Sequence, residues 1–208
     1  MITGAGSPAW IRVGRIGFGV LGVVALVWTP ARNGGAEWFS LGNYLSFFTV
    51  ESNILGVMVL LGGGLFDPGG RGWQVVRGAA TLYLLITGVV YAVLLANVDV
   101  LLYDRWVNHT LHRVLPIVLV VDWLLVSARL RVTARLVVGW MAYPVLYGVY
   151  SLIRGAMVGW YPYPFLDPRT QGYPSLLIGL VMFAVVFALM AVAVAGLDAR
   201  REPRDAPA

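Results

Sequence analysis

Hydrophobic residues in this chain fall into six long runs that are separated by short polar segments. An α-helix needs about 20 mostly apolar residues to cross the hydrocarbon core of a bilayer. In lipid the backbone finds no hydrogen-bond partner outside its own helix, so long apolar runs with few charges indicate membrane-spanning helices. We therefore predict six spans, over Ile11–Trp28, Tyr44–Leu65, Gly78–Leu95, Val107–Val126, Leu136–Ile153 and Ser175–Leu197.

This pattern predicts an all-α fold, a polytopic membrane bundle whose single six-span domain covers residues 1–197. Gly, Asn, Asp and Pro residues favour turns between the runs. The first run is too long for a signal peptide and lacks a clean cleavage site after it, so we expect it to be retained as a span. The charged, Pro-containing residues 198–208 predict a disordered tail.

The composition supports a membrane protein. The sequence is 59% hydrophobic and only 12% charged, whereas a soluble domain usually carries about 25% charged residues. Cysteine is absent, which excludes disulfides, thiolate metal sites and a cysteine nucleophile. We expect no metal and no other cofactor.

The orientation follows from the arginines, which supply all 15 positive side chains. Ten lie on the side of the N-terminus, four lie on the other side, and Arg113 lies within a span. Positive residues favour the cytoplasmic side, so we predict that both termini are cytoplasmic. The positive net charge is then a topology signal, and we expect no nucleic-acid partner.

Two polar residues lie at the same predicted depth near the outer surface. At about 1.5 Å per residue, Thr49 lies roughly 7–8 Å below the outer end of the second span, and His112 is about as deep in the fourth. Ser52 and Asn53 share the helix face of Thr49. Asn108 and His109 precede His112 by four and three residues, and we expect all three on one face.

Three further ionisable residues lie within the runs. Such groups are costly in a membrane and usually pair inside the protein. Glu51 is level with Arg113, which predicts an ion pair between the second and fourth spans. Asp122 lies about 15 Å deeper than His112. It could relay protons or bind a cation, or it could simply form a hydrogen bond to a Tyr or Trp of a neighbouring helix.

A histidine within hydrogen-bonding distance can activate a threonine hydroxyl as a nucleophile toward an ester or amide. Asn53 or Asn108 could donate to the oxyanion or orient the imidazole. The alternatives are a structural histidine that bonds a neighbouring helix, a metal or haem site, and a transporter in which Asp122 and the histidines relay protons.

The outer loop after the fifth run, residues 154–168, is rich in Tyr, Trp and Pro. Its aromatic residues fit the belt that membrane proteins form at the lipid–water interface. The dense proline spacing also fits a stiff lid or a wall of the site.

Three segments carry a resemblance to a known family. They follow the order of that family's motifs: Phe47-Phe48-Thr49, then Val107-Asn108-His109-Thr110-Leu111-His112 with Val114-Leu115-Pro116, and then Trp160-Tyr161-Pro162-Tyr163-Pro164-Phe165-Leu166. With them the chain resembles the androgen-induced-gene-one and androgen-dependent TFPI-regulating protein family, and more closely its bacterial "Pr-six-Pr" branch.

The resemblance implies an intramembrane threonine hydrolase that cleaves fatty-acyl esters. It implies Thr49 as the nucleophile, His112 as the base and His109 as a supporting residue, and the bacterial branch implies the bacterial plasma membrane. Animal members carry an acidic residue three positions after the threonine, where this chain has Ser52. We therefore predict a lipid-ester hydrolase whose partner is a membrane lipid, and the alternative is a non-enzymatic transporter or a lipid- or haem-binding membrane protein.

Overall fold

The computed structural model describes residues 6–95, 104–126, 128 and 130–199, and within these it is helical, without strands. Among the described residues, five helices are long and apolar enough to cross a membrane, which makes this an integral membrane protein. The elements are α1 (Ala9–Asn33), α2 (Leu41–Leu45), α3 (Phe48–Leu65), α4 (Arg71–Val90), η1 (Tyr91–Leu95), α5 (Arg105–His109), η2 (Thr110–Val114), α6 (Leu115–Leu125), α7 (Ala134–Val158), η3 (Pro164–Leu166) and α8 (Pro168–Ala199).

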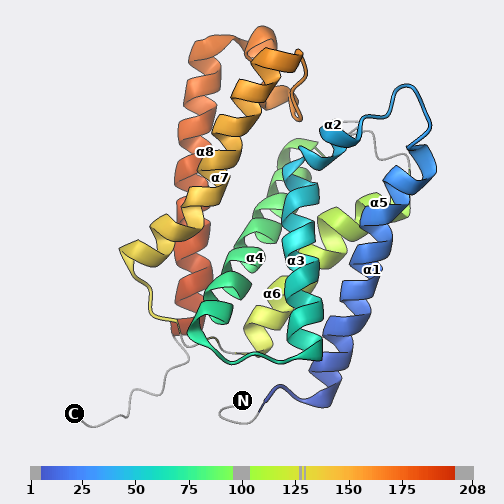
Figure 1. The fold of residues 1–208 in the computed structure, drawn as a ribbon. Coiled ribbons are helices and arrows are strands. Elements are labelled where there is room, and N and C mark those ends of the chain that lie inside the picture. The colour runs from blue at the N-terminus through green and yellow to red at the C-terminus, as the bar shows by residue number, and fades with distance from the viewer. Residues whose placement is uncertain (1–5, 96–103, 127, 129, 200–208) are drawn as a thin grey trace.

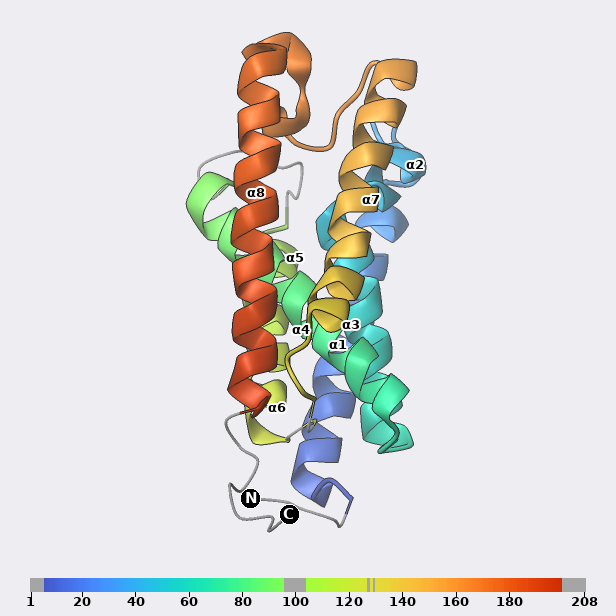
Figure 2. The ribbon, with the colours of Figure 1, turned by 90° about the vertical axis from the view of Figure 1, so that its left-hand side faces the viewer.

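The long elements run alternately up and down the bundle (Figure 1). α1, α3, α4 and the segments α5 to α6 pack together, while α7 and α8 lie to one side of them (Figures 1 and 2). α1 begins and α8 ends at the same end of the bundle, which we call the inner end (Figure 2). The opposite end, the outer end, contains α2 and η3.

The two predicted spans that carry Thr49 and His112 are each built from more than one helical piece. The run Tyr44–Leu65 is broken at Phe47, whose backbone is extended, so α3 begins afresh at Phe48. The fourth run is helical as far as Leu125, but η2 is a π-helical turn between α5 and α6. Wide π-turns inside α-helices are often found at functional sites. Both irregularities lie in the outer half of the bundle, where Thr49 and His112 were predicted.

α8 continues to Ala199, two residues beyond the predicted end of the last span. The remainder of the predicted tail lies outside the described residues. α8 also begins with a short turn that is interrupted at Gly172, which has a left-handed φ of 77°.

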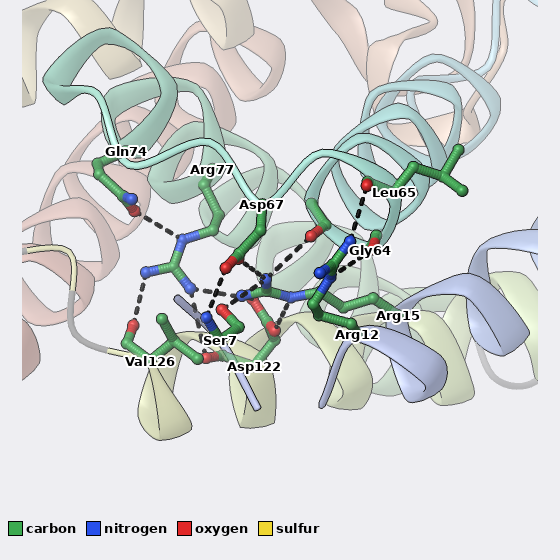
Figure 3. A network of polar contacts seen from close by, with 11 residues as sticks. Ser7, Arg12, Arg15, Gly64, Leu65, Asp67, Gln74, Arg77, Asp122 and Val126 are labelled. Atoms are coloured by element: carbon green, nitrogen blue, oxygen red, sulfur yellow. Dashed lines mark hydrogen bonds and ion pairs between the residues drawn. The ribbon is translucent and has the colours of Figure 1, made fainter. Parts of the chain in front are cut away.

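A buried ionic network joins three helices and a loop at the inner end (Figure 3). Arg15 of α1 contacts Asp122 of α6 through Nε at 2.6 Å, and Arg77 of α4 contacts the same carboxylate at 3.0 Å. Arg15 also reaches Asp67 in the α3–α4 loop at 3.2 Å. All three residues of the Asp122 cluster are at most 6% exposed, so the charges are paired within the protein.

The network revises the prediction for Asp122. Its partners are two arginines rather than a Tyr or a Trp, and these contacts account for the buried carboxylate without a proton relay. Arg15 and Arg77 are among the ten arginines assigned to the side of the N-terminus, and both side chains are buried. The long, flexible arginine side chain allows this, because it reaches from a helix end into the protein.

Candidate active site

The break before α3 places Thr49 in the first turn of an 18-residue helix. The first N–H groups of a helix have no partner within it. Here the N–H of Phe48 donates to the Tyr147 hydroxyl at 3.1 Å, and that of Thr49 donates to the Tyr163 hydroxyl at 3.3 Å. Thr49 therefore lies at the positive end of the α3 dipole, which favours a negative charge forming nearby.

Thr49 and His112 are in direct contact. Thr49 Oγ1 lies 3.1 Å from His112 Nε2, and both side chains are buried. His112 Nδ1 lies 3.1 Å from the backbone carbonyl of Asn108, which can only accept a hydrogen bond. Nδ1 therefore carries the proton, and Nε2 is left to accept from the threonine hydroxyl.

The imidazole is also held on its face. Tyr91 stacks on His112 with ring centroids 4.3 Å apart. The Tyr91 hydroxyl accepts a hydrogen bond from Asn108 Nδ2 at 2.9 Å. Asn108 thus orients the imidazole in two ways. Its backbone carbonyl accepts from His112 Nδ1, and its side-chain amide donates to Tyr91, which stacks on the imidazole.

Tyr163 is a site residue to which the sequence analysis assigned no chemical role. Its hydroxyl lies 3.4 Å from Thr49 Oγ1. Since the Thr49 hydroxyl proton is directed to His112 Nε2, the Tyr163 hydroxyl is the donor in its contact with Thr49 Oγ1. Burial raises the pKa of Tyr163, outweighing the lowering effect of its hydrogen bonds with Thr49, so it stays a neutral donor.

The chain brings Tyr163 to this position by a tight turn after α7. Gly159 adopts a left-handed φ of 70° at the end of that helix, a conformation that glycine adopts without strain. A Cβ on Gly155 would lie 2.1 Å from the ring of Tyr161, so glycine is needed for the loop to fold back onto the helix. In the sequence, the prolines on either side of Tyr163 were the feature that pointed to this loop as a wall of the site.

Ser52 and Asn53 support the backbone of Thr49. Ser52 Oγ donates to the Thr49 carbonyl at 3.2 Å and contacts the hydroxyl of Thr87 at 2.9 Å. Asn53 Nδ2 donates to the Thr49 carbonyl at 2.7 Å and to the Leu111 carbonyl at 3.1 Å. Asn53 therefore connects the segment of Thr49 to that of His112, but its amide does not face the reacting hydroxyl.

Two predictions about neighbouring residues are wrong. His109 is exposed while His112 is buried, because the π-turn that begins at Thr110 changes the face on which following residues lie. No ion pair joins Glu51 to Arg113 in the described structure. Glu51 instead accepts a hydrogen bond from the Tyr143 hydroxyl, and Arg113 lies 5.8 Å from the ring centre of Tyr91.

The resulting hydrogen bonds form one directed chain, from Tyr163 to Thr49, to His112 and to the Asn108 carbonyl. It contains a hydroxyl, a base with a free lone pair, and a neutral donor next to the hydroxyl. These are the groups that nucleophilic attack on a carbonyl requires. Over the described ranges, no three His, Asp or Glu side chains gather as a metal site.

The family model described as "FAR-17a/AIG1-like protein" matches residues 80–198 of the chain. The matched region includes His112 and Tyr163 and begins after Thr49. No curated protein and no solved structure matches the chain.

Proposed function

The chain belongs to the FAR-17a/AIG1-like family, and from this premise we propose that it is an intramembrane lipid-ester hydrolase with Thr49 as nucleophile and His112 as base. The observation that carries the proposal is the 3.1 Å contact between Thr49 Oγ1 and His112 Nε2, with the Nδ1 proton held by Asn108. The Tyr163 hydroxyl and the N-terminus of α3 lie beside the same threonine hydroxyl and support the proposal further.

In the first half of the proposed reaction, Thr49 Oγ1 attacks the ester carbonyl carbon while His112 Nε2 takes the hydroxyl proton. The negative charge moves to the carbonyl oxygen, where the hydroxyl of Tyr163 and the N-terminus of α3 stabilise it. When the bond to the alcohol oxygen breaks, His112 returns the proton to that oxygen. The products are a free alcohol and an acyl ester on Thr49.

In the second half, water attacks the acyl carbon with His112 again acting as base. The bond to Thr49 Oγ1 breaks, Oγ1 regains a proton from His112, and a carboxylic acid leaves. No cofactor takes part in these steps.

The proposal includes a topology of six spans with both termini in the cytoplasm. The segments α5, η2 and α6 follow one another over residues 105–125, which at 1.5 Å per residue gives about 30 Å of helix, enough for a sixth span. Arginines are concentrated in the loops of the inner end, which supports a cytoplasmic location for that end. The site then lies under the outer leaflet, and a membrane lipid is the expected substrate. A plasma-membrane location in a bacterium is part of the same proposal.

The test uses the purified protein in detergent, with a fluorophosphonate probe and a long-chain p-nitrophenyl ester. Thr49→Val and His112→Ala should abolish labelling and lower the rate of hydrolysis by about 10²–10⁴, the usual contribution of a general base. Thr49→Ser keeps a hydroxyl and should retain measurable labelling. His109→Ala is the matched control, because it removes the chain's other histidine, which is exposed.

Hydrolysis that persists in both Thr49→Val and His112→Ala would refute the assignment. A twofold effect at His112 would also count against it.

A further inference from the structure

Two cavities meet at the candidate nucleophile. One, of about 350 Å³, lies among α3, α4, α7, α8 and η3 and is almost wholly apolar; we call it the apolar cavity. The other, of about 200 Å³, lies at the outer end among α1, α2, α3 and η2 and includes Ser40, Asn43 and His112; we call it the polar cavity. Thr49 and Tyr163 line both cavities, so a carbonyl group at Thr49 would have one substituent in each.

The position of His112 decides which of the two cavities takes the alcohol part of the ester and which takes the acyl chain. His112 lines the polar cavity and is not among the residues of the apolar cavity. In ester cleavage the base returns its proton to the departing alcohol oxygen, so the alcohol must lie within reach of the imidazole. The alcohol part of the ester therefore belongs in the polar cavity, and the acyl chain belongs in the apolar one.

We propose that the apolar cavity is the acyl-chain pocket and that Gly148 of α7 determines which acyl chains it accepts. This inference rests on the proposed hydrolase function and names the part of the substrate that each cavity binds. The volume of the apolar cavity lies within the range of about 300–1,000 Å³ that is typical of small-molecule pockets.

The surroundings of Gly148 point to this role. Met141, Val145, Gly148 and Leu152 line the cavity from α7 at spacings of four, three and four residues, so they form one helix face that is directed into the cavity. A Cβ added at Gly148 would meet no atom within 4 Å. The space beside this glycine is therefore open, and a larger side chain can enter it without a clash.

The cavity also opens toward the lipid. Leu177 and Val181 of α8 line it, yet they are 61% and 64% exposed. In a membrane such an apolar surface faces acyl chains, so a lipid substrate can insert its chain between α7 and α8 without crossing a polar layer. The apolar lining and this lateral opening identify an acyl chain as the occupant.

The experiment compares Gly148→Leu with Gly139→Leu. Gly139 lies on the same helix, is exposed, and also has no atom within 4 Å of an added Cβ, but it does not line the cavity. Leucine is a better helix former than glycine, so neither change should unfold α7. We expect Gly148→Leu to lower kcat/KM for the p-nitrophenyl palmitate ester by about tenfold or more, as changes of apolar pocket size do, and to leave the acetate ester within about twofold. Gly139→Leu should change neither.

A binding measurement separates this inference from the function on which it rests. Thr49→Val protein, which cannot form an acyl-enzyme, is photolabelled with a diazirine-bearing palmitic acid, and the labelled peptides are identified by mass spectrometry. Labels on α7 and α8 that disappear when Gly148→Leu is added support the pocket, even if the wild-type protein hydrolyses no ester. Palmitate hydrolysis that is unaffected by Gly148→Leu, or labelling that is unaffected by it, would overturn the proposal.

Discussion

Thr49 and His112 are 63 residues apart in the chain, yet Thr49 Oγ1 lies 3.1 Å from His112 Nε2 in the buried outer half of the bundle. Two local irregularities make this contact possible. The break at Phe47 begins a new helix just before Thr49, and the π-turn Thr110–Val114 turns the imidazole inward. The following predictions test the groups around this contact and the ionic network at the inner end of the bundle.

Tyr163→Phe should lower kcat by about 10²–10³ with little change in KM, because an oxyanion donor acts mainly in the transition state. The measurement is steady-state hydrolysis of a soluble short-chain ester by the purified protein. Tyr150→Phe is the control, since its hydroxyl contacts Ser46 and not Thr49. A fall in kcat of less than about threefold would remove Tyr163 from the mechanism.

Asn53→Leu should reduce both stability and kcat. Leucine has a similar shape but cannot donate to the carbonyls of Thr49 and Leu111, and a lost buried partner costs about 1–3 kcal/mol. Thermal unfolding in detergent and kcat measure the two effects. Ser52→Ala removes a contact to the same Thr49 carbonyl but no connection to the segment of His112, so its effect on kcat should be smaller. Equal effects of the two variants on kcat would contradict a bracing role for Asn53.

Asp122→Asn should destabilise the protein by about 3–5 kcal/mol, because it leaves the buried guanidinium groups of Arg15 and Arg77 without their shared carboxylate. Activity per folded molecule should not change, since Asp122 lies in the last turn of α6, at the inner end of the bundle and away from His112.

Arg32→Gln is the matched control for Asp122→Asn. It breaks the ion pair with Asp104, in which Arg32 is 60% exposed, and an exposed pair contributes only about 0–1 kcal/mol. Normal stability of Asp122→Asn, combined with loss of a proton-driven flux, would revive the transporter alternative.

Acidic pH should weaken the contact between the N-terminal segment and the α3–α4 loop. Burial raises the pKa of Asp67, but hydrogen bonds from Ser7 and the positive charges of Arg15 and Arg12 more than compensate, so its pKa lies below the usual value. The folded state therefore binds fewer protons than the unfolded state. The resulting stabilisation is fully present above the unfolded pKa of about 3.9 and is lost as pH falls through the folded pKa.

The unfolding temperature of the wild type and of Asp67→Asn, measured between pH 7 and pH 3, tests this contribution. The wild type should be the more stable protein at pH 7, and the difference should shrink as pH falls. A difference that does not depend on pH would show that the carboxylate charge of Asp67 is not what stabilises the contact.

The sequence by itself determined the membrane class, the positions of five long helices and the common depth of Thr49 and His112, which meet in the candidate site. Apolar runs predict these helices because lipid leaves the backbone no other way to satisfy its hydrogen bonds. The rise per residue then gives depth, so Thr49 and His112 could be placed at one level before any contact was known.

Only the tertiary structure decided which side chains meet at that level. A side chain's direction rotates with every residue, so the π-turn Thr110–Val114 placed His109 and His112 on different faces although they are only three positions apart. Tyr163 enters the site from a loop whose path depends on the left-handed turn at Gly159. Arg15 and Arg77 reach Asp122 because their long side chains extend from one helix to another. The periodicity of residues within one helix does not indicate which residue of a neighbouring helix such a side chain will contact.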